Sequence, residues 1–488
     1  MLARYVKRGA YITFFYTVSS VIVRALNFIL LPYFLSRLTL TEFGIWDFYQ
    51  LFFSTGALLV TSCASTSLFR FYVLYKDDRA KQLQSIGNSF LFVLCSVVMM
   101  LVCGYFLLIN TYTGHFFSEY ASITLVSVSC FALYTMILSL LRVQEKLILY
   151  GIVFCGQNFL ALAGTLVGVH YNLGIKSFFY ANLFSFLIFV PWFFMLFFRN
   201  CFLSLNIFKR QLLFSGPLLL YNLIYMSFFV VDKFFIKNFL GFESLGLYGI
   251  LWRFGAVFQM IAIAMIDAWQ LIIYNAQKEN GANFLISRLI TYYALALTSF
   301  CFYSTIGAIF AVIFLFPAHY YYLIHYLPLF FLPLFFIELA RLFQTAFGLS
   351  TRTFYLPLIS LTILIVQSSL LYFCIGFGIW SVFIANGVAF MVYALLCYWV
   401  SKKVYSYQLI NKEKMDKIIV FVVFSLFSLH CLVSYIPQTF LSLVGFGLLW
   451  PLYVWLFGII ESDEKAWIAL KIYQIFASFR GKVSSIKK

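Results

Sequence analysis

Polar side chains interrupt the first long apolar segment of the sequence at regular intervals. They are Thr13, Thr17, Ser20, Arg24 and Asn27, at spacings of four, three, four and three. This spacing places them on one face of an α-helix. No acid lies within a helical turn of Arg24, and an unpaired guanidinium deep in an apolar helix costs about 3 kcal/mol or more. The pattern favours anion binding by Arg24, and the alternative is an ion pair with an acid from another helix.

Two further segments add candidate binding residues. The second apolar segment carries Asp47, Gln50, Ser54, Ala57 and Thr61 at the same helical spacing. Faces of this kind suit either tight helix packing or a water-filled cavity. Arg253, in the eighth segment, is the counterpart of Arg24 in the second half, although its side chain could also reach the membrane interface. We take Arg24, Asn27, Gln50 and Arg253 as candidate substrate-binding residues.

Other ionisable residues inside apolar segments have neighbours of opposite charge. Asp232 stands beside Lys233, which favours a neutralising pair near the outer interface over a protonatable relay. Glu338 and Arg341 lie three residues apart, a spacing that brings them together on one helix. Asp232, Glu338 and Arg341 are therefore candidates for ion coupling or for structural ion pairs.

The sequence offers no sign of covalent chemistry. Its 10 cysteines include no C-x-x-C pair, and its 5 histidines lack metal-ligand spacing. No nucleophile elbow, P-loop or dinucleotide fingerprint is present. We expect no catalytic site, no metal and no cofactor, and we do not expect an enzyme.

The composition defines the environment of these side chains. Of 488 residues, 64% are hydrophobic and 10% are charged, whereas soluble domains carry about a quarter charged residues. The sequence predicts an all-α integral membrane protein of about fourteen transmembrane helices. These lie near 10–34, 44–69, 86–110, 119–141, 148–169, 176–198, 211–236, 246–275, 288–316, 326–350, 354–375, 378–400, 417–436 and 439–460.

The basic residues predict the orientation of the chain. Most of the 33 Lys and Arg residues fall in the even-numbered connections and the two tails, which places both termini in the cytoplasm. This rule puts Lys76, Lys209 and Lys412 inside, with His115 and His319 outside. It explains the net charge of +17 without nucleic acid. The basic, amphipathic residues 463–488 predict a helix that lies on anionic membrane lipids.

An internal repeat organises the chain. With a shift of 202 residues, the segment from Leu38 to Trp46 lies over the segment from Leu240 to Tyr248, and Gly44 coincides with Gly246. A shift over six helices keeps their orientation, so it predicts two pseudo-symmetric six-helix lobes related by an axis along the membrane normal. The expected divisions are 1–200 and 201–403 for the lobes, 404–462 for two additional helices, and 463–488 for the tail.

The repeated segments also carry a family resemblance. The run from Leu30 to Ile45 resembles the end of the first helix in bacterial polysaccharide-unit flippases of the O-antigen, Wzx type. The run from Val230 to Tyr248 resembles the seventh-helix signature of that family. The resemblance implies membership of the multidrug, oligosaccharidyl-lipid and polysaccharide transporter superfamily. It also implies a cationic central cavity, with Arg24 at a matching position and Arg253 a less secure match.

The resemblance implies a function that composition alone does not supply. Such a protein moves undecaprenyl-diphosphate-linked oligosaccharide from the cytoplasmic to the periplasmic leaflet of the bacterial inner membrane by alternating access. A polysaccharide polymerase is a further partner to expect. Two alternatives stay open: a drug or organic-cation antiporter of the same superfamily, which should prefer acids in its central space, and a membrane-embedded polysaccharide polymerase or acyltransferase.

Overall fold

The computed structural model confirms an all-α membrane protein. It describes residues 19, 21–110, 115–200, 202–276, 282–349, 354–404 and 412–435. Within these ranges there is no strand, and 10 helices are long and apolar enough to cross a membrane. The predicted span at 439–460 and the amphipathic tail lie outside the described residues.

The first half of the chain forms one group of helices. Its elements are α2 (Leu31–Arg37), α3 (Leu40–Leu74), α4 (Arg79–Asn110), α5 (His115–Val143), α6 (Leu147–His170), α7 (Lys176–Leu187) and α8 (Val190–Arg199). A helical stretch at residues 21–29, which we call the N-terminal helix, precedes them. Side chains of α3 to α8 form a separate core around Phe90, Tyr134 and Phe193.

The second half forms another group. Its elements are α9 (Leu205–Ala276), α10 (Ala282–Leu315), α11 (Leu323–Leu349), α12 (Tyr355–Cys374), α13 (Ile379–Val404) and α14 (Lys412–Tyr435), with short 3₁₀ turns η1 (Ala318–Tyr320) and η2 (Ile375–Phe377). Helix α11 is central, because it packs against α9, α10, α13 and α14. Its buried aromatic residues, such as Phe330 and Phe335, join the larger core of the molecule.

Two predicted spans are interrupted, and two others are joined into one long helix with a break between them, each for a local reason. The N-terminal helix ends at Leu30, and α2 restarts with Pro32 in its first turn, a position that proline tolerates. The span at 176–198 is divided between α7 and α8, where Pro191 again opens the new helix. Gly241 adopts a φ of 83° within α9 and so separates the two predicted spans 211–236 and 246–275.

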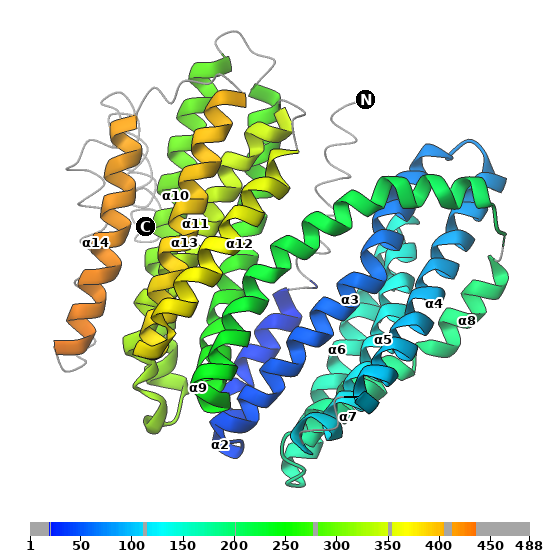
Figure 1. Ribbon diagram of the computed structural model, residues 1–488, viewed down its shortest axis with the longest axis horizontal. Coiled ribbons are helices and arrows are strands. Elements are labelled where there is room, and N and C mark those ends of the chain that lie inside the picture. The colour runs from blue at the N-terminus through cyan, green and yellow to red at the C-terminus, as the bar shows by residue number, and fades with distance from the viewer. Residues whose placement is uncertain are drawn as a thin grey trace, which may run out of the picture.

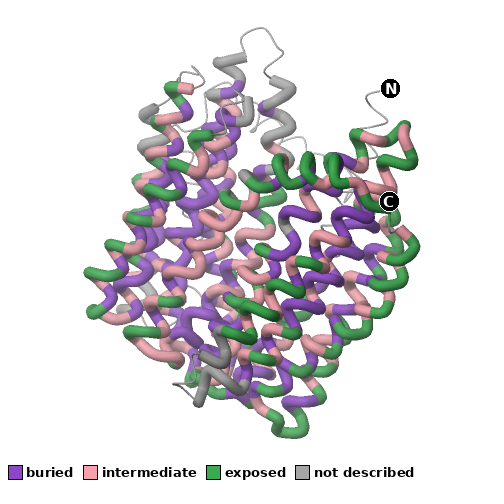
Figure 2. Tube along the Cα trace, turned by 45° about the vertical axis from the view of Figure 1, so that its right-hand side comes forward, coloured by how far each residue is buried: buried purple, intermediate pink, exposed green. Residues whose placement is uncertain are grey.

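Figure 1 shows how the two groups are arranged. Helices α3 to α8 lie on the right, α10 to α14 lie on the left, and α9 crosses from one group to the other. The groups meet at the lower end, where α3 and α9 pack together, and their helices diverge towards the upper end. Figure 2 shows exposed residues along the outer sides of the helices. Large apolar side chains such as Met99, Ile152 and Phe373 are among the exposed residues. Lipid is the solvent that such surfaces require.

Candidate functional site

A pair of glycines lies at the contact between the two groups. A Cβ on Gly44 would stand 1.8 Å from the carbonyl oxygen of Phe242, and a Cβ on Gly246 would stand 2.0 Å from that of Leu40. Both carbonyl partners and both glycines are related by the same shift of 202 residues. A two-fold axis passing between the helices would produce such a reciprocal contact. Glycine is required at both positions because backbone, which cannot move aside, occupies the space of a side chain.

An ion pair lies one turn further along the same contact. The ammonium of Lys233 on α9 is 2.7 Å from a carboxylate oxygen of Asp47 on α3, and both side chains are nearly buried. Asp47 packs over Gly249, whose missing side chain makes room for it. The expected neutralising pair between Asp232 and Lys233 is therefore wrong. We call the group of α2 to α8, with the N-terminal helix, the first lobe and the group of α9 to α14 the second lobe. Adjacent residues on a helix point about 100° apart, so Lys233 reaches the first lobe while Asp232 points into the second.

Asp232 belongs to a buried polar network inside the second lobe. Its carboxylate accepts hydrogen bonds from the hydroxyl of Tyr248, from Asn386 at 3.4 Å and from the backbone N–H of Lys233 at 2.7 Å. Gln367 donates to Asn386 and to the carbonyl of Phe228, each at 3.0 Å. Several N–H and O–H donors thus compensate the buried carboxylate directly.

The two arginines predicted for binding both meet the stretch of α9 from Arg253 to Ala256. Arg24 on the N-terminal helix donates a hydrogen bond of 3.2 Å to the carbonyl of Ala256 on α9. Arg253 lies one helical turn before Ala256 and faces the ring of Phe43, with 5.9 Å between its guanidinium carbon and the ring centroid. The Nε of Arg253 is buried and has no hydrogen-bond partner among the described residues. Asp47 is close enough to interact with this guanidinium electrostatically.

Gln259 adds a donor that the sequence analysis missed. It follows Ala256 by three residues on α9, and its buried side-chain N–H₂ has no partner within the described ranges. Buried polar groups are nearly always hydrogen-bonded, so unpartnered donors mark a place where a ligand or water belongs. Its spacing of six residues from Arg253 puts the two side chains about 120° apart around the helix, so no sequence pattern groups them. Arg24, Arg253 and Gln259 form what we call the interlobe donor cluster.

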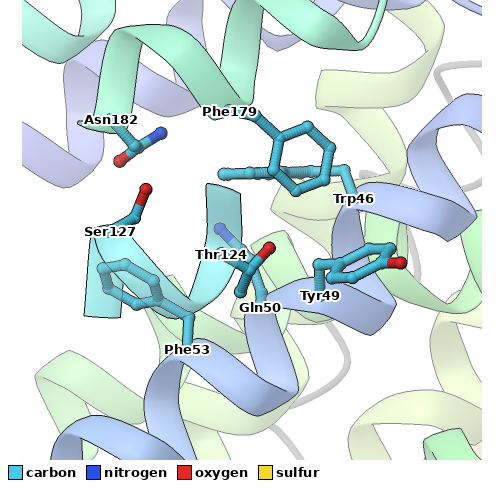
Figure 3. A pocket seen from close by; sticks show the side chains of 8 residues that line it. All are labelled: Trp46, Tyr49, Gln50, Phe53, Thr124, Ser127, Phe179 and Asn182. Carbon is cyan, nitrogen blue, oxygen red and sulfur yellow. The ribbon is translucent and has the colours of Figure 1, made fainter. Parts of the chain in front are cut away.

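The other two predicted binding residues lie elsewhere. Asn27 lines a groove of about 330 Å³ between the N-terminal helix and α6. Gln50 faces a separate cavity within the first lobe, together with rings such as Trp46 and Phe179 and polar groups such as Ser127 (Figure 3). That cavity measures about 10 Å³, which is room for one water molecule. The structure therefore separates Gln50 from the arginines.

Glu338 and Arg341 on α11 form the expected ion pair. Their closest charged atoms are 2.9 Å apart, and Arg341 also donates to the hydroxyl of Tyr225 on α9. Glu338 is fully buried, so both charges are satisfied inside the second lobe. Over the described ranges, no three His, Cys, Asp or Glu side chains are arranged to hold a metal ion.

Comparison with known proteins identifies the fold. No protein-family model matches the sequence, and no curated protein matches it. Among solved structures, the lipid II flippase MurJ in an inward closed conformation aligns with 92% of this chain and 98% of its own, with a TM-score of 0.65 and 14% identity.

Two MATE transporters are also similar. An inward-facing multidrug resistance transporter of the MATE family and MOP superfamily aligns with 81% of this chain and 98% of its own, with a TM-score of 0.59 and 14% identity. A mutant of the Vibrio cholerae MATE transporter VcmN covers 84% of this chain and 98% of its own, with a TM-score of 0.52 and 15% identity. The chain therefore has the fold of MOP-superfamily transporters.

Proposed function

We propose that this chain is a flippase of the bacterial inner membrane. It moves undecaprenyl-diphosphate-linked oligosaccharide units from the cytoplasmic to the periplasmic leaflet by alternating access, with both termini in the cytoplasm. The interlobe donor cluster carries the proposal. Arg24, Arg253 and Gln259 supply N–H groups along one stretch of α9, and a diphosphate is a ligand that guanidinium and amide donors suit.

The charges near the cluster also favour an anion. Lys233 and Lys237 lie on successive turns of α9 before the break at Gly241. The ammonium of Lys237 is 5.4 Å from the centroid of the Phe48 ring on α3. Asp47 is already paired with Lys233, and the Asp232 carboxylate is enclosed by hydrogen-bond donors. A transporter of organic cations needs an available carboxylate, which these paired acids do not offer.

The membrane potential is a sufficient source of energy for much of the step. Moving about two negative charges outward through about 100 mV, inside negative, releases up to roughly 5 kcal/mol. No covalent chemistry is required. A polysaccharide polymerase that consumes the translocated unit is the partner that this role implies.

The substrate is tested in a strain that lacks the gene. We expect the strain to accumulate a diphosphate-linked oligosaccharide, identified by mass spectrometry, and to lose surface polysaccharide. Expression of the wild type restores export. Arg24→Ala and Arg253→Ala should abolish export while the proteins still insert at normal levels, and Arg24→Lys should retain part of it as a charge without the bidentate fork.

A matched control and one contrary result complete the test. Arg37→Ala removes an exposed arginine at the end of α2, outside the cluster, and should export normally. Normal export by Arg24→Ala would contradict anion binding. The Arg24→Ala protein could instead be absent from the membrane. If a variant that exchanges Arg24 with a partner acid then restores both the protein level and export, Arg24 is a structural ion-pair residue.

A further inference from the structure

A groove lies beside Asn27, about one turn along the N-terminal helix from Arg24. Its walls come from two helices of the first lobe. Ile22, Val23, Leu26 and Asn27 belong to the N-terminal helix, and Cys155, Gly156, Asn158, Phe159 and Leu162 belong to α6. Its volume of about 330 Å³ lies at the lower end of the range for pockets that hold small molecules. The walls are mostly apolar.

A missing side chain keeps the groove open. A Cβ on Gly156 would meet no atom within 4 Å, so the wall at this point is empty space rather than close packing. Ile22, Leu26 and Phe159 are more than a third exposed along the same groove. The first lobe thus presents apolar surface that no described side chain covers.

The two asparagines of the groove each donate a hydrogen bond within their own helix. Asn27 donates its amide N–H to the carbonyl of Val23 at 3.0 Å, and Asn158 donates to that of Phe154 at 2.8 Å. Each side chain therefore folds back onto its own helix, which satisfies a donor locally. An apolar occupant of the groove leaves these two hydrogen bonds in place.

The groove adjoins the cationic side of the N-terminal helix. Arg24 and Asn27 are three residues apart, so they lie about 60° apart around the axis and about 4.5 Å apart along it. A ligand whose anionic end meets Arg24 can therefore place an attached chain past Asn27 into the groove. Positive charge at one end and an apolar channel at the other complement an amphiphile.

We propose that this groove binds the isoprenoid units next to the diphosphate of the lipid carrier. The inference rests on the proposed function and deepens it. As the diphosphate moves between the lobes, it draws the first isoprenoid units away from the bilayer, and the groove supplies apolar contacts there. The protein thus recognises the diphosphate and the adjoining isoprenoid units of the lipid together, with Arg24 between the two.

The test compares two probes and two matched variants in lipid nanodiscs. Farnesyl diphosphate carries both features, and inorganic pyrophosphate carries the anion alone. Gly156→Leu fills the groove from a position where a side chain meets no clash. Gly307→Leu is the control, because a Cβ on Gly307 of α10 also meets no atom within 4 Å and lies outside the groove.

We expect the wild type and Gly307→Leu to bind farnesyl diphosphate at least about tenfold more tightly than pyrophosphate, as contacts to a few buried carbons would give. Gly156→Leu should lose that preference and keep its affinity for pyrophosphate. A full preference in Gly156→Leu would overturn the assignment of the groove. Equal binding of both probes by the wild type would overturn it too, while the anion site would stand. Binding of neither probe would contradict the proposed function itself.

Discussion

Two neighbouring residues of α9 lead to two different kinds of polar contact. Lys233 crosses to the first lobe and pairs with Asp47, whereas Asp232 turns into the second lobe and is held by Tyr248 and Asn386. The first contact joins bodies that alternating access would separate. The second lies within one body and stays enclosed whichever way the lobes move. A buried charge is therefore informative about function only when its partner is known.

The surroundings of the two contacts differ in the same way. The pair between Asp47 and Lys233 lies beside the close approach of Gly44 to Gly246, where backbone meets backbone across the lobes. The network of Asp232 lies among large buried rings such as Phe228 and Tyr393. We expect changes at the first contact to alter the position of the lobes and changes at the second to alter folding.

The largest effect should come from the glycines. Gly44→Ala places a methyl group 1.8 Å from the carbonyl oxygen of Phe242, and Gly246→Ala meets that of Leu40 at 2.0 Å. Since backbone cannot yield, the lobes cannot close at this end, and surface polysaccharide export should fall to the level of the deletion strain. Gly216→Ala, where a Cβ meets no atom within 4 Å, should export normally. Export by Gly44→Ala at the wild-type rate would show that the close approach is dispensable.

Loss of the Asp232 carboxylate should be costly for folding. Asp232→Ala leaves the buried Tyr248 hydroxyl without its acceptor, and the Asn386 amide keeps only the Tyr248 oxygen as an acceptor. We expect a loss of about 3 kcal/mol in stability. Thermal unfolding of the purified protein measures it. Asp232→Asn keeps an acceptor and should lose less, and Asp47→Asn should change the unfolding temperature least. If Asp47→Asn proves the more destabilising change, the distinction between the two contacts is wrong.

The ion pair between the lobes should act on their closure. The reporter is a single cysteine, Phe242→Cys, labelled by a maleimide added outside the cell. We expect Asp47→Lys or Lys233→Asp alone to increase the labelling rate about 5- to 150-fold, which corresponds to a coupling free energy of about 1–3 kcal/mol. The background lacks the native cysteines. The double exchange restores the attraction and should restore protection. Failure of the exchange to restore protection would mean that the pair does not hold the lobes together.

The smallest effect should come from the start of α3. Thr39 and Glu42 form a capping box, in which Thr39 accepts from the backbone N–H of Glu42 at 3.2 Å and Glu42 accepts from that of Thr39 at 2.9 Å. Thr39→Ala should cost about 1 kcal/mol of stability. Thr39→Ser keeps the cap and should unfold like the wild type. Equal losses in the two variants would point to the methyl group rather than the cap.

Local patterns were predictable from the sequence. The apolar segments determined where helices form, and the spacing of three residues paired Glu338 with Arg341. Contacts between the lobes were harder to predict from the sequence. The choice of Asp232 as the partner of Lys233 failed because adjacency along a chain says nothing about which way two side chains point in a helix. The superposition of the two lobes and the roles of the binding residues stay predictions.

The sequence by itself determined the solvent of this protein, its helical segments and the glycines of its repeat, because these depend on composition and on periods within one segment. Only the tertiary structure decided that the amide nitrogen of Gln259 is buried without a partner among the described residues, that Gln50 lies apart from the arginines, and that the space beside Gly156 is open. The physical reason is that such relations depend on how each helix is rotated and on which neighbour it meets. Those quantities are set by packing among all the helices together.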